Sequence, residues 1–205
     1  MHNPFLVRPL YFLYSLIFPS KAYNKENFPK GRALIVANHY SALDACYMYK
    51  FVKKDIYFLA KKEALKKKFA SWFLKEVGAI PIDRENNDVR AMMNAIKVLK
   101  EDKKLVVFPE GTRNKVDMEL KNIKGGAGVF AVKTKTPVVP IIFYNRAKAF
   151  RRRIMIVGKP FELTEFYDKK LQKEDIDKID EIIREKMLDA QKEIREIKSK
   201  KKKCK

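Results

Sequence analysis

The sequence contains few of the residues that build disulfide frameworks and metal centres. Cysteine occurs only at Cys46 and Cys204, and histidine only at His2 and His39. The two cysteines are far apart, one in an apolar stretch and one in a lysine run. They form neither a disulfide framework nor a cluster of metal ligands, and they suit a reducing cytosol. We therefore expect no metal ion in this protein.

Long apolar runs are also missing. The longest uncharged run covers residues 9–20, and as a helix it would extend roughly 18 Å, against about 30 Å of bilayer hydrocarbon. No small-residue cleavage site follows it, so it lacks the layout of a signal peptide. Its aromatic residues lie between Arg8 and Lys21, which favours a helix on a membrane surface. Burial of the same helix against the domain is the alternative.

Acidic residues are scarce relative to basic ones. The chain has 46 Lys and Arg against 25 Asp and Glu, a formal net charge of +21 that is shared almost equally by its two halves. The whole surface should therefore attract polyanions, and both nucleic acid and anionic membrane fit that charge. Residues 198–205 are mostly lysine, which predicts a frayed, solvated tail or a contact for anionic lipid.

The remaining pattern alternates short apolar strands with helical stretches. Because the strands are continuously apolar rather than alternating, they predict a sheet covered on both faces, typical of an α/β protein. We expect strands at 33–37, 56–60, 79–82, 105–108, 138–143 and 154–157, and helices at 42–53, 63–68, 71–76, 88–100, 126–133 and 174–197.

The chain divides into three segments of one domain. Residues 1–24 are predicted as an N-terminal membrane-associating helix, and residues 25–170 as the α/β body. Residues 171–205 are predicted as an amphipathic helix, with apolar residues at helical steps between 176 and 197, followed by the lysine-rich tail.

His39 follows the first predicted strand and precedes a helix that contains Asp44. If this helix begins near Ser41, Asp44 lies in its first turn and its carboxylate can approach the imidazole. A carboxylate that accepts from Nδ1–H fixes the tautomer and leaves Nε2 free to take a proton. A structural interpretation also fits, because Ser41 and Asp44 match a helix capping box.

Further polar residues follow other predicted strands. The strand at 105–108 runs into Pro109-Glu110-Gly111-Thr112-Arg113-Asn114, and cations follow two more strands at Lys61 and Arg84. Arg113 offers a planar fork suited to phosphate, and Gly111 permits close approach of backbone N–H groups. Each feature alone is typical of a turn or a solvated charge. Together they predict a pocket for a phosphate-bearing substrate beside a proton-transfer group.

These segments, in this order, resemble the glycerolipid acyltransferase family, which includes 1-acylglycerol-3-phosphate acyltransferases. The family's first motif is matched by Asn38, His39, Ser41 and Asp44. Residues 78–84 look like its second motif, residues 108–113 match its third, and residues 138–140 are similar to its fourth. The third motif commonly continues with serine, where this chain has Asn114. The matched region runs from about residue 32 to 143, and its ordered combination is highly specific.

The resemblance implies a single α/β domain with a central mixed, largely parallel sheet. It also implies an O-acyltransferase that moves a fatty acyl group from acyl-carrier protein or coenzyme A to the sn-2 hydroxyl of 1-acylglycerol 3-phosphate, giving phosphatidic acid. His39 would be the general base and Asp44 its orienting partner. Arg113, Arg84 and Lys61 would bind the phosphate, and Glu110, Gly111 and Thr112 would shape the acceptor site. No organic cofactor is implied.

The expected partners are a lysophospholipid, the acyl thioester and an anionic membrane surface, with the protein peripheral on the cytoplasmic face. Glycerol 3-phosphate or another lysolipid is an alternative acceptor, and a non-catalytic binder of anionic lipid or nucleic acid is a further alternative. We expect no nucleic acid, because the aromatic residues concentrate in residues 5–23 instead of interleaving with cations along a sheet. Covalent catalysis is disfavoured, because the chain lacks a Gly-x-Ser-x-Gly elbow and Cys46 is expected in the core.

Overall fold

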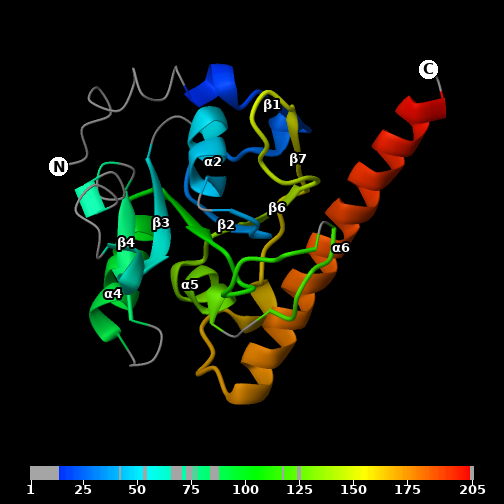
Figure 1. The fold of residues 1–205 in the computed structure, drawn as a ribbon. Helices are drawn as coiled ribbons and strands as arrows, with labels where there is room; N and C mark the ends of the chain where they lie inside the picture. Colours follow the sequence, from blue (N-terminus) through cyan, green and yellow to red (C-terminus); the bar gives the residue numbers. More distant parts are fainter. Residues whose placement is uncertain are drawn as a thin grey trace.

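A computed structural model describes residues 14–41, 43–52, 55–65, 71–72, 76, 78–83, 88–116, 118–123 and 126–203 (Figure 1). Within these residues, one seven-stranded sheet has the order β1-β7-β6-β2-β5-β3-β4. Its strands are β1 Ser20–Tyr23, β2 Ala33–Ala37, β3 Ile56–Lys61, β4 Ala79–Ile82, β5 Lys104–Val107, β6 Val138–Phe143 and β7 Arg153–Val157. The α-helices with assigned bounds are α2 Asp44–Val52, α4 Val89–Lys100, α5 Ala127–Thr134 and α6 Lys173–Lys203.

The sheet is mixed and largely parallel, as predicted. Strand β2 pairs in parallel with β5 and β6, and β3 pairs in parallel with β5 and β4. Strand β7 runs antiparallel to β6, to which a short connection joins it, and β1 pairs in parallel with β7. The carboxyl ends of β2, β3, β5 and β6 therefore meet at one edge of the sheet, where polar loops can form a site.

Both faces of the central strand are covered, which is why β2 is continuously apolar. Leu34 and Val36 point into a core shared with α4, α5 and α6, whereas Ile35 and its neighbours on the same face pack with Tyr47 and Met48 of α2. Successive side chains of a strand point to opposite faces, so each face of β2 needs its own apolar residues. This confirms the prediction of a sheet buried on both sides.

The N-terminal segment differs from its prediction. Residues 20–23, predicted as part of the membrane-associating helix, form strand β1 because their backbone pairs with β7. Residues 14–17 are helical, and Tyr14 packs on the domain: its ring lies 5.5 Å from that of Tyr47, and its hydroxyl donates to the carbonyl of Leu43 at 3.5 Å. Residues 1–13 lie outside the described residues.

The predicted short helices after β3 also differ in part. Lys62–Leu65 forms a 3-10 helix in place of the first turn of the helix expected at 63–68. Residues 66–70 lie outside the described part of the chain, and residues 71, 72 and 76 are helical. Two further 3-10 helices cover Lys25–Asn27 and Thr164–Phe166.

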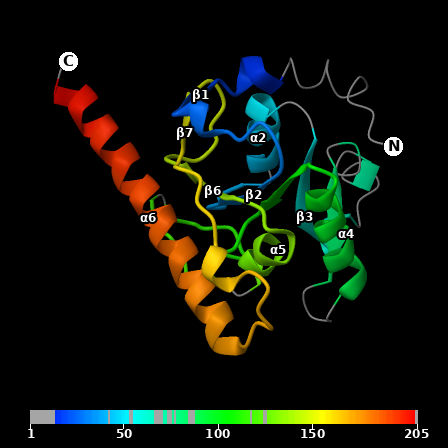
Figure 2. The ribbon, with the colours of Figure 1, turned by 180° about the vertical axis from the view of Figure 1, so that it is seen from behind.

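Helix α6 is longer than its apolar stripe predicts (Figure 2). Ile179, Ile183, Met187, Ala190 and Ile194 are buried along one face, which confirms the amphipathic interpretation. The expectation of a frayed tail from residue 198 was wrong, because the helix continues to Lys203. Lysine is a good helix former, and positive charge is favourable at a helix C-terminus, so the tail extends the helix. No helix in the described ranges is both long and apolar enough to cross a bilayer.

Replacing Asp180 with asparagine is expected to stabilise the protein at neutral pH. Asp180 is 9% exposed, and its Oδ1 has no hydrogen-bond partner among the described residues. Burial, with a smaller contribution from Asp177, raises its pKa from 3.8 to about 6. Because the folded state holds this proton more tightly, stability falls as pH rises from about 4 to 6, by on the order of 1–3 kcal/mol.

Chemical denaturation at pH values above and below this range tests the prediction. Asp180→Asn should gain stability over the parent above about pH 6 and show no gain below about pH 4. Asp177→Asn, on the exposed side of α6, is the matched control and should give a smaller gain. An equal gain from Asp180→Asn at both pH values would contradict the assignment.

Candidate active site

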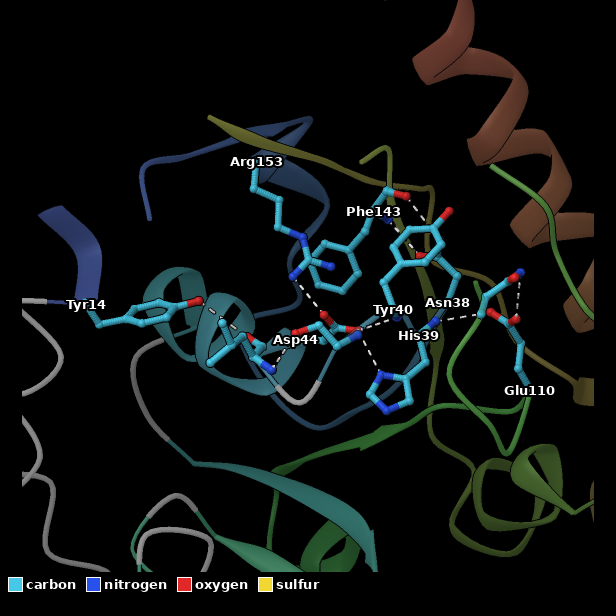
Figure 3. Close-up of polar contacts among 11 residues, drawn as sticks. Tyr14, Asn38, His39, Tyr40, Asp44, Glu110, Phe143 and Arg153 are labelled. Carbon is cyan, nitrogen blue, oxygen red and sulfur yellow. Dashed lines mark hydrogen bonds and ion pairs between the residues drawn. The ribbon is translucent and has the colours of Figure 1, made fainter. Parts of the chain in front are cut away.

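The site begins where β2 ends. Asn38 is fully buried, and its side chain makes two hydrogen bonds to the backbone of Phe143 at the end of β6: Nδ2 donates to the carbonyl at 3.0 Å, and Oδ1 accepts from the amide at 2.7 Å. The Asn38 side chain thus takes the place of backbone hydrogen bonds and extends the pairing of β2 with β6 by one residue. The next residue, His39, is thereby held at the carboxyl edge of the sheet, beside Asp44 at the start of α2 (Figure 3).

His39 and Asp44 approach as the sequence predicts. Helix α2 begins at Asp44, and His39 Nδ1 lies 2.7 Å from Asp44 Oδ2. The same oxygen accepts from the backbone amides of Tyr40 at 2.7 Å and Ser41 at 3.0 Å. Because an ionised carboxylate can only accept, Nδ1 carries the hydrogen and Nε2 of a neutral ring is the acceptor. The Asp44 carboxylate therefore does both things that the sequence suggested: it caps the start of α2 and it orients the His39 imidazole.

Arg153 lies on the far side of Asp44 from His39, and its role was not predicted from the sequence. Arg153 is the first residue of β7 and is 1% exposed. Its Nη1 lies 2.7 Å from Asp44 Oδ1, and its guanidinium lies 3.9 Å from the ring centroid of Phe143 and 4.4 Å from that of Tyr47. The contact with Asp44 is an ion pair without hydrogen-bond geometry, reinforced by the two aromatic faces.

A signal for Arg153 existed in the sequence but was weak. Arg151, Arg152 and Arg153 precede an apolar strand, and three successive arginines are typical of a solvated turn. Extending that strand by one residue would have placed position 153 on the same face as Met155, which is buried. Only the arrangement of β7 beside β6 shows that this face meets α2.

The surroundings keep Asp44 ionised. Burial by itself raises the pKa of Asp44, but the hydrogen bond from His39 and the positive charge of Arg153 outweigh it, so the pKa is lowered from its ordinary value. A buried carboxylate held ionised between an imidazole and a guanidinium favours the imidazolium that forms when Nε2 takes a proton. The arrangement is therefore suited to general-base chemistry at His39 Nε2.

The loop after β5 holds His39 from the other side. The ring of Phe108 stacks on the imidazole, with centroids 4.2 Å apart and planes at 22°. Glu110 Oε1 accepts from the backbone amide of His39 at 3.1 Å, and the amide of Asn114 donates to the carbonyl of His39 at 2.6 Å. The His39–Asp44 pair and the loop at residues 108–114, which were predicted separately, thus form one site.

Glu110 connects this loop to the segment that follows it. It is 2% exposed, and its Oε2 accepts from Asn114 Nδ2 at 3.5 Å and from the amide of Lys121 at 3.4 Å. Burial raises its pKa, although the hydrogen bonds from His39 and Lys121 oppose the shift. Glu110 therefore holds the backbone around His39 in place, and its carboxylate is buried beneath the loop that carries the exposed Thr112 and Arg113.

The other predicted residues that the structure describes, Gly111, Thr112, Arg113 and Lys61, follow strands β5 and β3 at the same sheet edge and differ in exposure. Gly111 has a φ of 69°, in the left-handed region, and turns the chain so that Thr112 and Arg113 are exposed. Lys121 Nζ donates to Thr112 Oγ1 at 3.5 Å and to the Arg113 carbonyl at 3.3 Å. Lys61, at the end of β3, lies 3.8 Å from Glu63 in an exposed ion pair. Arg84 lies outside the described residues.

Cys46 is a core residue, as predicted. Its side chain is 6% exposed on α2, and burial raises the pKa of its thiol to about 11. The thiol is therefore neutral near pH 7 and is a poor nucleophile. In the ranges that the structure describes, no group of three or more His, Cys, Asp or Glu side chains is arranged to hold a metal ion.

The His–Asp pair at the carboxyl edge of the sheet and the Phe-Pro-Glu-Gly-Thr-Arg loop that holds it are the segments that resemble the glycerolipid acyltransferases. The profile of the acyltransferase family matches residues 20–144. The chain belongs to this family and is an acyltransferase.

Two relatives and one solved structure show which members of the family this chain is similar to. The chain is 33% identical over 153 residues to the 1-acyl-sn-glycerol-3-phosphate acyltransferase of Bacillus subtilis, covering 71% of this chain and 75% of that one. It is 31% identical over 176 residues to the enzyme of the same name from Streptococcus pneumoniae, covering 82% and 64%. The crystal structure of the 1-acyl-sn-glycerophosphate (LPA) acyltransferase from Thermotoga maritima matches 87% of this chain and 72% of its own at a TM-score of 0.64 and 26% identity.

Proposed function

We propose that this protein transfers a fatty acyl group from acyl-carrier protein or coenzyme A to the sn-2 hydroxyl of 1-acylglycerol 3-phosphate, giving phosphatidic acid. The observation that carries the proposal is the 2.7 Å contact between His39 Nδ1 and Asp44 Oδ2, which leaves Nε2 as the proton acceptor. The names of the relatives support the choice of acceptor.

In the proposed reaction, His39 Nε2 takes the hydroxyl proton as the oxygen attacks the thioester carbonyl. The C–O bond forms, a tetrahedral intermediate collapses, and the C–S bond breaks to release the thiol carrier. A thiol has a pKa of about 8.5, so it departs as a thiolate with little acid assistance. The proton on the imidazolium then passes to the thiolate or to water. Asp44 orients the ring and stabilises its charged form throughout.

The acceptor's phosphate is the second part of the proposal. Arg113, exposed on the loop after β5, offers two parallel N–H groups to a phosphate. Lys61 at the end of β3, and Arg84, which follows β4 in the sequence, would add charge. Gly111 and Thr112 would shape the acceptor site. The mechanism needs no metal ion or organic cofactor, because the thioester is already activated. We further propose that the protein works as a peripheral protein on the cytoplasmic face of the membrane.

Incubation of the full chain with a panel of acceptors tests this function. The panel contains lysophosphatidate, glycerol 3-phosphate, other lysolipids and monoacylglycerol, each with acyl-carrier-protein and coenzyme A thioesters, and products are identified by mass. Phosphatidic acid is expected as the preferred product. Acylation of another acceptor with a higher kcat/KM would replace the proposed substrate, and no thioester consumption with any pair would remove the proposed activity.

Replacing Arg113 with alanine should lower kcat/KM for lysophosphatidate about tenfold, the effect of losing one charge-assisted contact. Acylation of monoacylglycerol, which has no phosphate, should change little, so the variant discriminates less between the two acceptors. Arg184→Ala, on an exposed position of α6, is the matched control. Equal losses with both acceptors would show that Arg113 does not bind the phosphate.

A further inference from the structure

The connection between β6 and β7, residues 144–152, is a strongly basic hairpin, referred to below as the hairpin. Its nine residues contain no carboxylate and carry four cations, Arg146, Lys148, Arg151 and Arg152. Arg146 lies with its guanidinium 5.9 Å from the ring centroid of Tyr40, the residue after His39. The hairpin and the helical residues 14–17 lie together at the upper side of the molecule in both Figure 1 and Figure 2.

Phe150 is displayed at the tip of this hairpin. Its side chain is 79% exposed, the largest exposed fraction among the large hydrophobic residues that the structure describes. Its backbone has a φ of 57°, in the left-handed region, which is uncommon for an aromatic residue. The turn is closed by a bridge between Lys148 and Arg151, so the exposed aromatic sits on ordered backbone. Packing inside the domain does not account for this placement.

The hairpin is joined to a second exposed apolar residue. The amide of Phe150 donates to the carbonyl of Ile17 at 2.6 Å. That bond anchors the tip to the helical turn that carries Leu16, whose side chain is 59% exposed. Two exposed apolar side chains on linked segments, surrounded by cations, are typical of a surface that contacts a bilayer.

Two hollows beside the hairpin are lined by cations. The smaller, about 300 Å³, is lined by Asn145, Arg146, Lys148, Arg151 and Arg152. The larger, about 770 Å³, shares Arg152 and adds Lys21, Arg195, Lys198 and Lys201 from β1 and α6. Within the larger hollow, burial acts to raise the pKa of Tyr23, but a hydrogen bond from Lys201 and the charges of Lys21 and Lys198 lower it overall. Both hollows are therefore electropositive.

We propose that the hairpin 144–152 is the membrane-docking element, with Phe150 and Leu16 entering the interfacial zone and the surrounding cations binding phosphates of anionic lipids. The inference rests on the proposed function for its reason, since the acceptor is a lipid. It goes further in naming the surface that reaches the bilayer. An acidic carrier protein would match the cations alone, whereas exposed apolar side chains at the tip match a bilayer as well. Docking here brings the lipid surface next to Tyr40 and His39.

Vesicle sedimentation with the full chain tests the surface. Binding is compared for phosphatidylcholine vesicles and for phosphatidylcholine mixed with phosphatidylglycerol, at near-physiological salt. Each basic residue at a membrane surface contributes about fivefold to binding, so Lys148→Glu with Arg151→Glu should weaken binding to the anionic vesicles by about 25-fold or more. Phe150→Asp should also weaken it. Arg184→Glu with Lys186→Glu on exposed positions of α6, and Met93→Asp on α4, are the matched controls.

A fluorescent reporter locates the contact independently of affinity. The chain has one tryptophan, Trp72, so Phe150→Trp in a Trp72→Phe background places a single indole at the tip. Its emission should shift to the blue on addition of anionic vesicles and should be quenched by brominated lipids. The same change at Met93 should leave the emission unchanged. Equal weakening by control and hairpin variants, or an unshifted indole at position 150, would overturn the proposal.

Activity assays separate this proposal from the proposed function. With lysophosphatidate dispersed in detergent, Phe150→Asp should keep the parent rate, whereas the rate on vesicles should fall with binding. If the hairpin variants bind vesicles normally but lose affinity for the acyl-carrier-protein donor in detergent, the surface docks the carrier and the membrane assignment is wrong. If the parent binds vesicles through Phe150 but acylates no acceptor in either format, the docking surface stands and the proposed activity fails.

Discussion

Replacing His39 with alanine is expected to lower kcat for acyl transfer by about 10²- to 10⁴-fold, the usual contribution of a general base. The expectation follows from Nε2, which faces away from the Asp44 contact and is the acceptor in the neutral ring. The variant should still fold, because Asp44 keeps Arg153 and the amides of Tyr40 and Ser41 as partners. The backbone bonds of position 39 to Glu110 and Asn114 also remain.

Steady-state rates of thioester consumption measure this effect. Vesicle binding and KM for the acceptor are the internal controls, because neither uses the imidazole as a base. His39→Gln adds a second test, since it keeps polarity but cannot take a proton near neutral pH, and it should be as slow as alanine. A variant that retains the parent rate would remove the proposed mechanism.

Replacing Arg153 with methionine is expected to destabilise the fold by about 3–5 kcal/mol, the cost of leaving one charge of a buried pair without its partner. Asp44 is fully buried, and Arg153 Nη1 lies 2.7 Å from its Oδ1. Arg153→Lys should recover only part of the loss, because an ammonium lacks the planar face that lies against Phe143 and Tyr47. Arg152→Met, at the exposed neighbouring position, should unfold like the parent.

The pH dependence distinguishes a positioning role for Arg153 from a purely structural one. The guanidinium helps to keep the pKa of Asp44 low, so its removal raises that pKa and the carboxylate is neutralised at a higher pH. The activity of Arg153→Met relative to the parent should therefore be lowest on the acidic side of the profile and recover as pH rises. A uniform loss at every pH would indicate that Arg153 supports only the fold.

A double-mutant cycle sharpens the test. Combining Asp44→Asn with Arg153→Met removes both charges, so the double variant should be more stable than either single variant, as expected for a buried ion pair. Its activity should stay low, because the imidazole has lost its charged partner. Additive losses in stability would contradict a direct energetic link between the two residues.

Much of the site could be predicted from local sequence because its members lie next to one another in the chain. His39 and Asp44 share one strand–turn–helix segment, so their approach depends only on where α2 begins. The Phe-Pro-Glu-Gly-Thr-Arg loop follows β5, and parallel pairing of β5 with β2 brings both strand ends to one edge. Local pattern and the rule that polar loops gather at this edge were sufficient.

Contacts between segments that are far apart in the sequence could not be predicted from local patterns. Arg153 lies more than a hundred residues after Asp44 in the chain, and its partner is visible only once β7 is turned antiparallel to β6. Glu110 was predicted to shape the acceptor site, and that role stays a prediction. Its hydrogen bonds to the amides of His39 and Lys121 were not predicted, because they join segments that are distant in the sequence. Strand β1 was not predicted, because its four residues show little alternation of apolar and polar side chains. They adopt a strand conformation by pairing with β7.

By itself the sequence determined the α/β class, the order of most elements and the His39–Asp44 pair, because periodicity, capping and short loops are local properties of the chain. The tertiary structure alone decided that a buried arginine would pair with ionised Asp44 and that Phe150 would stand exposed beside the helical residues 14–17. These depend on the direction and position of β7, which long-range strand pairing sets and no local pattern of residues encodes.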